Sequence, residues 1–325
     1  MEDKMKKITV LLGCILVFNF FFINDMEAAS TNVTQVKSNN DYTLGEVQTI
    51  LENYLKNNGK NLSLNTQEFD QFATDQLLDD KDKALVNHEK YGMICDFLVY
   101  YLQERQNNND ITKMKNKTIG QISKEGLEEE NNVEQIVKEN ENKIKAFGSS
   151  YSVTKAQAYA RKWYNGRNRN YNDYSGSGGD CTNYVSQILY SGGKKEDQDR
   201  RAEPLWVNST TYYWYSFITK QGIGKGFRHG RAVSSSWIRV SDFGAYWARS
   251  QKVKTYTNTK DVIKNAKPGD VIQFMKNGRS TYFHTMFVYG KSNGTLQLSG
   301  HSTDYLKRNI KNISGIKKYR LIKFT

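Results

Sequence analysis

The sequence has few cysteines and no long hydrophobic run beyond its N-terminal segment. There are three cysteines among 325 residues, and only Cys95 and Cys181 remain if that segment is removed. A scaffold built from disulfides needs more pairs than this, so that class of protein is excluded. No second stretch of about 20 apolar residues is present, so we expect a soluble mature protein without stable membrane insertion.

Several catalytic motifs are also missing. The chain has no HExxH, no paired CxxC and no cluster of histidines and carboxylates at metal-ligand spacing, which argues against a metal site. It also lacks the GxSxG elbow of serine hydrolases and the GxxxxGK[ST] loop that binds phosphates. We therefore expect neither a metal nor a cofactor.

Acidic residues are scarce in the second half of the chain. Residues 151–325 contain 30 Lys and Arg against 10 Asp and Glu, whereas residues 1–150 contain 17 against 24. A basic domain on an exported protein indicates an anionic partner. Peptidoglycan and the anionic polymers of a Gram-positive wall are the expected partners. Nucleic acid is the competing choice, but no nucleic-acid motif supports it.

Residues 1–30 have the pattern of a signal peptide. Lys4, Lys6 and Lys7 precede an apolar run from Ile8 to Ile23, and Ala28-Ala29 follows where cleavage would occur. The alternative is a retained membrane anchor, because the apolar run is longer than most signal cores. We expect a secreted or wall-associated protein of a Gram-positive bacterium.

The rest of the chain divides into two regions. Residues 31–146 show helical periodicity, with Thr66 as a helix cap, and contain no catalytic constellation; their role is left open. Residues 151–325 begin with two helices and continue as strands, which predicts an α+β domain. The expected helices cover 152–166 and 181–189, and the expected strands are Asp270–Phe274, His284–Tyr289, Leu296–Ser299 and Tyr319–Phe324.

Cys181 is the candidate nucleophile. It begins a helix after a glycine-rich loop, at the end where free backbone N–H groups and the helix dipole favour a thiolate. The N–H groups around Gly179, Asp180 and Cys181 can also stabilise an oxyanion. The alternative is an inert core cysteine, because Cys181 lies on the apolar side of its helix. That interpretation is the favoured one for Cys95, which lies in an apolar stretch.

Two histidines lie in the predicted strands downstream. His284 opens one strand, and an imidazole at the sheet rim can take the proton of Cys181 and return it to a leaving amine. His301 ends the next strand and is the first choice for a third, polar residue that orients His284. Asp304 is the alternative for that role.

The run Gly179-Asp-Cys-Thr-Asn-Tyr-Val-Ser-Gln187, followed by Gly192-Gly193, resembles the signature of the putative amidase domain family of Gram-positive bacteria. Further matches lie on both sides of this run, in the same order as in the family, and cover nearly all of 151–325. They are Ala158-Tyr-Ala160, Ser236-Trp237, Pro268-Gly-Asp-Val271, His284 and Gly300-His-Ser-Thr-Asp304. The resemblance does not include residues 31–146.

This resemblance implies a papain-like α+β fold related to the NlpC-type and CHAP-type cysteine amidohydrolases. It also implies a Cys-His-polar triad of Cys181, His284 and His301. The expected activity is cleavage of wall amide bonds by acyl transfer, with Asp180 capping the helix or orienting the loop. Trp206, Trp214 and Trp237 are candidates for a substrate groove or for the core. The competing function is a non-catalytic, basic wall-binding module on the same fold.

Overall fold

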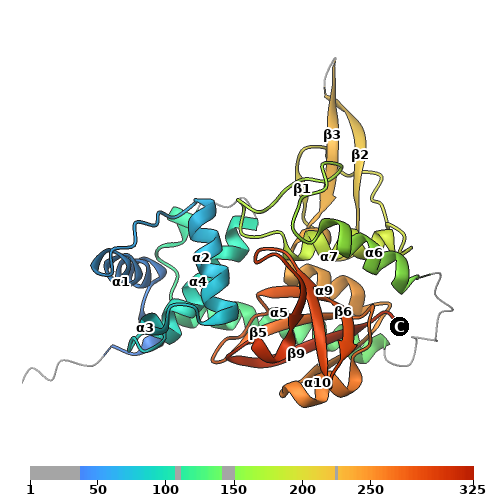
Figure 1. Cartoon of the computed structure of the whole chain (residues 1–325). Coiled ribbons are helices and arrows are strands. Elements are labelled where there is room, and N and C mark those ends of the chain that lie inside the picture. The colour runs from blue at the N-terminus through green and yellow to red at the C-terminus, as the bar shows by residue number, and fades with distance from the viewer. Residues whose placement is uncertain (1–36, 107–110, 141–150, 224–225) are drawn as a thin grey trace, which may run out of the picture. The chain divides into compact units, whose positions relative to one another are not determined.

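A six-stranded antiparallel sheet organises the C-terminal part of the molecule (Figure 1). The computed structural model describes residues 37–106, 111–140, 151–223 and 226–325, so the predicted signal peptide lies outside the described residues. Within this sheet the strand order is β4-β9-β5-β6-β7-β8. The strands are β4 (Lys252–Tyr256), β5 (Val271–Lys276), β6 (His284–Ser292), β7 (Thr295–Gly300), β8 (Tyr305–Asn309) and β9 (Ile316–Lys323).

A second, smaller sheet was not predicted. It has the order β1-β3-β2 and is formed by β1 (Val207–Asn208), β2 (Ser216–Ile223) and β3 (Gly226–Ser234). In Figure 1, β2 and β3 form a long ribbon that extends away from the six-stranded sheet. Residues 207–234 lack the regular alternation of polar and apolar residues that is typical of a strand, so the sequence does not predict this sheet.

The two helices predicted at the start of the C-terminal region are present. Helix α6 (Val153–Trp163) begins after Ser152, whose hydroxyl accepts a hydrogen bond from the Lys155 N–H. Helix α7 (Cys181–Ser191) begins after Asp180 and ends at Gly192. The other helices of this part are α8 (Ser235–Ile238), α9 (Val240–Ala248) and α10 (Thr259–Asn265).

The N-terminal region is helical, as its periodicity predicts. Thr66 caps α2 through a hydrogen bond from the Phe69 N–H. Two helices cover the segment from Lys83 to Gln106, because the chain turns at residues 87–90, where His88 Nδ1 accepts the Lys90 N–H. The helices are α1 (Leu44–Asn57), α2 (Gln67–Asp79), α3 (Lys83–Val86), α4 (Tyr91–Gln106) and α5 (Ile119–Asn140).

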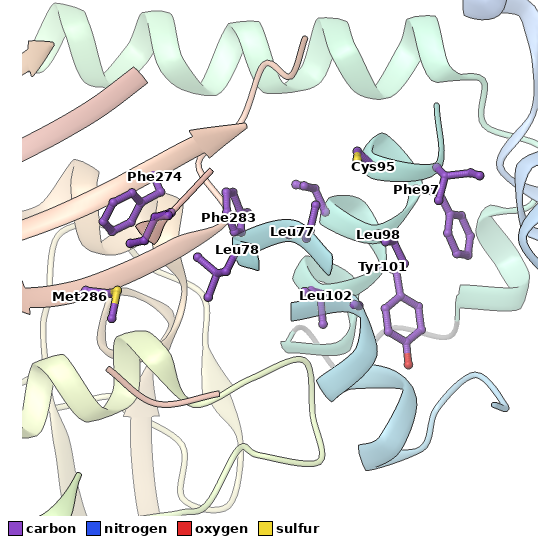
Figure 2. Close-up of a cluster of buried hydrophobic side chains, with 14 of the residues drawn as sticks. Leu77, Leu78, Cys95, Phe97, Leu98, Tyr101, Leu102, Phe274, Phe283 and Met286 are labelled. Atoms are coloured by element: carbon purple, nitrogen blue, oxygen red, sulfur yellow. The ribbon is translucent and has the colours of Figure 1, made fainter. Parts of the chain in front are cut away.

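The six-stranded sheet is covered on both faces, and side-chain alternation assigns residues to each face. Val271 and Phe287, paired across β5 and β6, pack in one core with Tyr184 and Val185 of α7. Their neighbours Ile272, Phe274, Met286 and Val288 point the other way and pack in a core with the N-terminal helices. Figure 2 shows Phe274, Phe283 and Met286 on one side of this second core and α2 and α4 residues such as Leu77 and Leu98 on the other. We call these the α7 face and the N-terminal face.

Ion pairs add to this packing at the edge of the N-terminal face. Lys276 is 3% exposed; its ammonium binds Asp80 Oδ1 at 2.7 Å and the Leu77 carbonyl at 2.9 Å. Arg308 pairs with Asp79. The N-terminal helices and the sheet therefore share one core and its polar border, within a compact unit of residues 37–325.

The predicted α+β class is confirmed, with helices and antiparallel sheets in one unit. The narrower assignment to a papain-like fold stays a prediction. In the part of the chain that is described, no helix is both long enough and apolar enough to cross a membrane.

Candidate active site

Cys181 is the first residue of α7, so it lies at the N-terminal end of the helix, as the sequence predicts. Its side chain is 2% exposed and lies among Val240, Met275 and Tyr282. The sulfur contacts the Thr182 hydroxyl at 3.7 Å, and this hydroxyl donates to Thr285 Oγ1 at 3.0 Å. The sulfur therefore lies against the α7 face of the sheet, at the start of β6.

The electrostatics of Cys181 differ from the sequence-based expectation. Burial raises the pKa of the thiol, and the hydrogen bond from the Thr285 backbone N–H, together with the contact to the Thr182 hydroxyl, offsets this only in part. A helix N-terminus stabilises an anion by about 0.3–1 kcal/mol, up to about 2 kcal/mol in favourable sites. Removing an ion from water costs several times more. In the described conformation Cys181 is a neutral thiol, so the predicted thiolate is corrected.

His284 does not meet Cys181. It pairs in register with Phe274, which belongs to the N-terminal face, and Thr285, one residue on, points to the α7 face. A methyl group built on Gly300 would lie 2.9 Å from Met286 Cε and 3.6 Å from His284 Nε2, which places the ring on the same face as Met286. The backbone of β6 therefore separates the imidazole from the sulfur.

The surroundings of His284 also make it a weak base. The residue is 2% exposed, and burial lowers the pKa of the ring to about 3. Neither ring nitrogen hydrogen-bonds to another residue in the part of the chain that is described. The expectation of an imidazole at the open rim of the sheet is corrected, because the N-terminal helices cover that rim.

His301 lies on the α7 face, but both of its nitrogens are engaged. Nδ1 lies 2.7 Å from Asp180 Oδ2, and Nε2 lies 2.8 Å from the Trp163 carbonyl oxygen. The ring stacks on Tyr184, with centroids 3.7 Å apart. Because both nitrogens face these acceptors, neither is directed at Cys181 or at the N–H of His284. The structure thus gives His301 a role in holding Asp180.

Asp180 orients the loop before Cys181 rather than capping α7. Its side chain makes no cap hydrogen bond. Instead, Oδ1 accepts from the Tyr174 N–H at 3.2 Å and from Asn183 Nδ2 at 2.7 Å, while Oδ2 faces His301. Of the two roles expected for Asp180, orientation of the loop matches these contacts.

Asp304, the alternative third residue, does not contact His284 either. Both of its carboxylate oxygens accept from Arg167, at 3.0 and 3.1 Å. Arg167 Nε also lies 3.4 Å from Asp180 Oδ2. Arg167 therefore joins Asp304 to the Asp180–His301 pair, which is a link that the sequence did not reveal.

The three tryptophans separate into two groups. Trp214 and Trp237 are fully buried, with ring centroids 4.4 Å apart, and they belong to the core against α7. The groove role is therefore corrected for both, and the core alternative holds. Trp206 is 57% exposed, and its groove role stays a prediction.

Two pockets lie near the loop before α7. One of about 240 Å³ is lined by α2 residues, by Gly179 and by Arg167 and Asp304. The other, of about 110 Å³, is lined by Gln106, Val240 and acidic side chains that include Glu104 and Asp242. Cys181 lines neither pocket. Among the described residues, no three His, Cys, Asp or Glu side chains gather in a way that would hold a metal ion.

Comparison with known proteins gives one family and one relative. The model of a family described as "Putative amidase domain" matches residues 150–324. A Bacillus subtilis (strain 168) protein named "Uncharacterized protein YhbB" is 26% identical over 176 residues. That match covers 51% of this chain and 46% of the relative, so the chain spans less than half of the relative's length. No solved structure matches.

Proposed function

Because the chain belongs to the family described as "Putative amidase domain", we propose that it is a secreted, cysteine-dependent hydrolase of amide bonds in the bacterial cell wall. The observation that carries this proposal is the position of Cys181. It is the first residue of α7, follows a glycine-rich loop, and has backbone N–H groups beside its sulfur.

The reaction we propose is acyl transfer. The thiolate of Cys181 attacks the amide carbonyl, and the N–H groups at the start of α7 stabilise the oxyanion. The carbon–nitrogen bond then breaks, the amine leaves with a proton, and water cleaves the thioester. On this route the sulfur must first become accessible and a base must reach it, because the described conformation provides neither.

The wall as the place of action is supported by charge. Residues 151–325 hold 30 basic and 10 acidic residues, which favours binding to an anionic polymer. The predicted partners, peptidoglycan and anionic wall polymers, and the predicted export are part of the same proposal.

A second function is favoured by a specific observation, the burial of Cys181 without a base in contact. A basic module that binds the wall without cleaving it would need neither an exposed thiol nor a nearby imidazole. This alternative keeps the fold and the charge of the proposed hydrolase, and differs from it only in chemistry.

Replacement of the sulfur separates the two functions. Purified peptidoglycan is incubated with the full chain or with its Cys181→Ala variant, and released fragments are identified by mass spectrometry. If the protein is a hydrolase, the original chain should release fragments with new amine and carboxyl ends. The Cys181→Ala variant should release at least about 100-fold less of these fragments. Equal sedimentation of both proteins with the wall, without any release, establishes the binding module instead.

His284→Gln is a sharper test of the predicted triad. If the imidazole is the base, this variant loses activity as Cys181→Ala does. If the described separation persists during turnover, the variant keeps activity within about 3-fold, because the ring then takes no part in proton transfer. Thermal unfolding of each variant confirms that the fold is kept.

A further inference from the structure

The loop that precedes Cys181 is held by residues far away in the sequence. Gln106, the last residue of α4, donates from its side-chain amide to the carbonyls of Gly178 and Gly179, at 3.2 and 3.3 Å. Gln106 is 5% exposed, so these hydrogen bonds are shielded from water. They fix two consecutive peptide groups just before Asp180 and Cys181.

Asp70 of α2 binds the same loop at the Gly178 N–H. Its Oδ2 accepts the Gly178 N–H at 3.1 Å, and its Oδ1 accepts the Tyr101 hydroxyl at 2.7 Å. Arg105 lies 3.4 Å from Asp70 Oδ2 and donates to the Gly176 carbonyl. Asp70 is 2% exposed, and a buried carboxylate needs partners. Arg105 and these hydrogen-bond donors supply them.

The glycines allow this close contact. Gly178 and Gly179 have φ of +81° and +108°, which side chains rarely adopt. A Cβ on Gly178 would lie 2.2 Å from the Leu102 carbonyl oxygen of α4, so the loop backbone lies directly against the helix. The docking of the loop on α4 therefore requires glycine at position 178.

We infer that Asp70, Arg105 and Gln106 are positioning residues of the amidase site, although all three lie outside the family-matched segment 150–324. They fix the loop whose conformation sets where the Cys181 sulfur and the first N–H groups of α7 point. The site is then formed by two parts of the chain, and residues 150–324 alone lack the groups that hold the loop. This inference rests on the proposed role of Cys181 as nucleophile.

Two readouts test the inference, and one of them does not depend on enzyme activity. The first is the rate at which iodoacetamide alkylates Cys181, followed by peptide mass spectrometry so that Cys95 is counted separately. The second is wall cleavage as a function of wall concentration. The variants are Gln106→Ala and the isosteric Asp70→Asn, and the matched control is Gln103→Ala, on the same helix but without a contact to the loop.

Release of the loop is expected to expose the sulfur and to disturb its geometry at the same time. Alkylation of Cys181 should rise about 10-fold in Gln106→Ala, because the first turn of α7 opens more often when the loop before it is no longer anchored. The maximal rate of wall cleavage should fall about 10-fold, while the concentration at half-maximal rate changes less than about 2-fold. Asp70→Asn keeps the shape of the carboxylate and should show the same split to a smaller degree.

Gln103→Ala should leave both readouts unchanged. An alkylation rate in Gln106→Ala and Asp70→Asn within about 2-fold of the original chain would overturn the inference, whatever the activity. A fully active Cys181→Ala protein would instead overturn the proposed function. A variant that does not fold is replaced by Gln106→Asn, which shortens the amide by one carbon but keeps its chemistry.

Discussion

The two faces of the six-stranded sheet carry different parts of the expected chemistry. The α7 face holds Cys181, Asp180 and His301, connected by side-chain contacts and by the start of α7. The N-terminal face holds His284 among Phe274 and Met286, beneath the N-terminal helices. Cys181 and His284 are 103 positions apart, and their neighbours Thr182 of α7 and Thr285 of β6 are hydrogen-bonded. One layer of backbone nevertheless separates the thiol from the imidazole. Proximity along a strand does not establish contact between side chains.

The largest expected effect concerns the two cores. Phe274 and Phe287 are both fully buried, on the N-terminal face and the α7 face respectively. Either Phe→Ala substitution should lower the free energy of unfolding by about 3–5 kcal/mol, measured by urea denaturation. A cost below about 1 kcal/mol for Phe274→Ala alone would mean that the N-terminal helices do not depend on this face.

The next effect is a pH dependence that belongs to the N-terminal face. Because burial lowers the pKa of His284 to about 3, the folded state binds a proton less readily than the unfolded state. This group therefore destabilises the fold as the pH falls below about 6.5, by a few kcal/mol near pH 3. His284→Leu should remove that part of the pH dependence between pH 6.5 and 3.

The imidazole itself can be followed by NMR. Its ring proton should keep the chemical shift of a neutral imidazole down to about pH 4, whereas an ordinary histidine changes near pH 6.5. A midpoint near pH 6.5 at this site would show a solvated ring, and would restore His284 as a candidate base.

A smaller effect tests the polar border between the N-terminal helices and the sheet. Burial raises the pKa of Asp80, but hydrogen bonds from Lys276, Ser314 and Tyr91 outweigh it, and the net pKa is lowered. The carboxylate therefore stabilises the fold above about pH 3.8, and this contribution is lost as the pH falls through the lowered value. Asp80→Asn should cost about 1.5–3 kcal/mol at pH 7.

This cost should vanish in acid. In urea denaturation at pH 2, the difference between Asp80→Asn and the original chain should shrink well below its value at pH 7. A difference that is the same at both pH values would show that the amide loses packing rather than the ion pair with Lys276.

The smallest effect is expected outside both faces. Trp206 is 57% exposed, so Trp206→Ala should change the free energy of unfolding by less than about 0.5 kcal/mol. Its effect on wall sedimentation is the informative measurement, because an exposed indole that binds a ligand loses affinity without a change in stability. Unchanged sedimentation would remove Trp206 from the candidate groove.

Local signals in the sequence were enough to predict much of the fold. The cap at Thr66 and the start of α7 at Cys181 depend on neighbouring residues, and both are present. The side of the sheet on which His284 lies could not be predicted. Strand β5 is buried along its whole length, including its polar residues Gln273 and Lys276, so polar residues do not mark an exposed face of the sheet there.

The contacts of the glycine loop were also beyond the sequence. Gly178 binds Asp70 across 108 positions, and no periodicity relates the two. The same holds for His301, whose ring nitrogens are engaged by Asp180 and by the Trp163 carbonyl, 121 and 138 positions away. The residue types at the site were found, but which of them meet depends on long-range packing.

The shared core of α2, α4 and the sheet limits how residues 150–324 can be expressed without the N-terminal helices or joined to another protein. If the chain were truncated before residue 150, the N-terminal face of the sheet would be exposed to water. Ile272, Phe274, Met286 and Val288 would then form one continuous hydrophobic surface. Any chain that carries a sheet of this kind needs a second cover, whether supplied by its own flanking sequence or by self-association. A segment that replaces this flank must therefore contain an amphipathic helix whose apolar side covers the sheet.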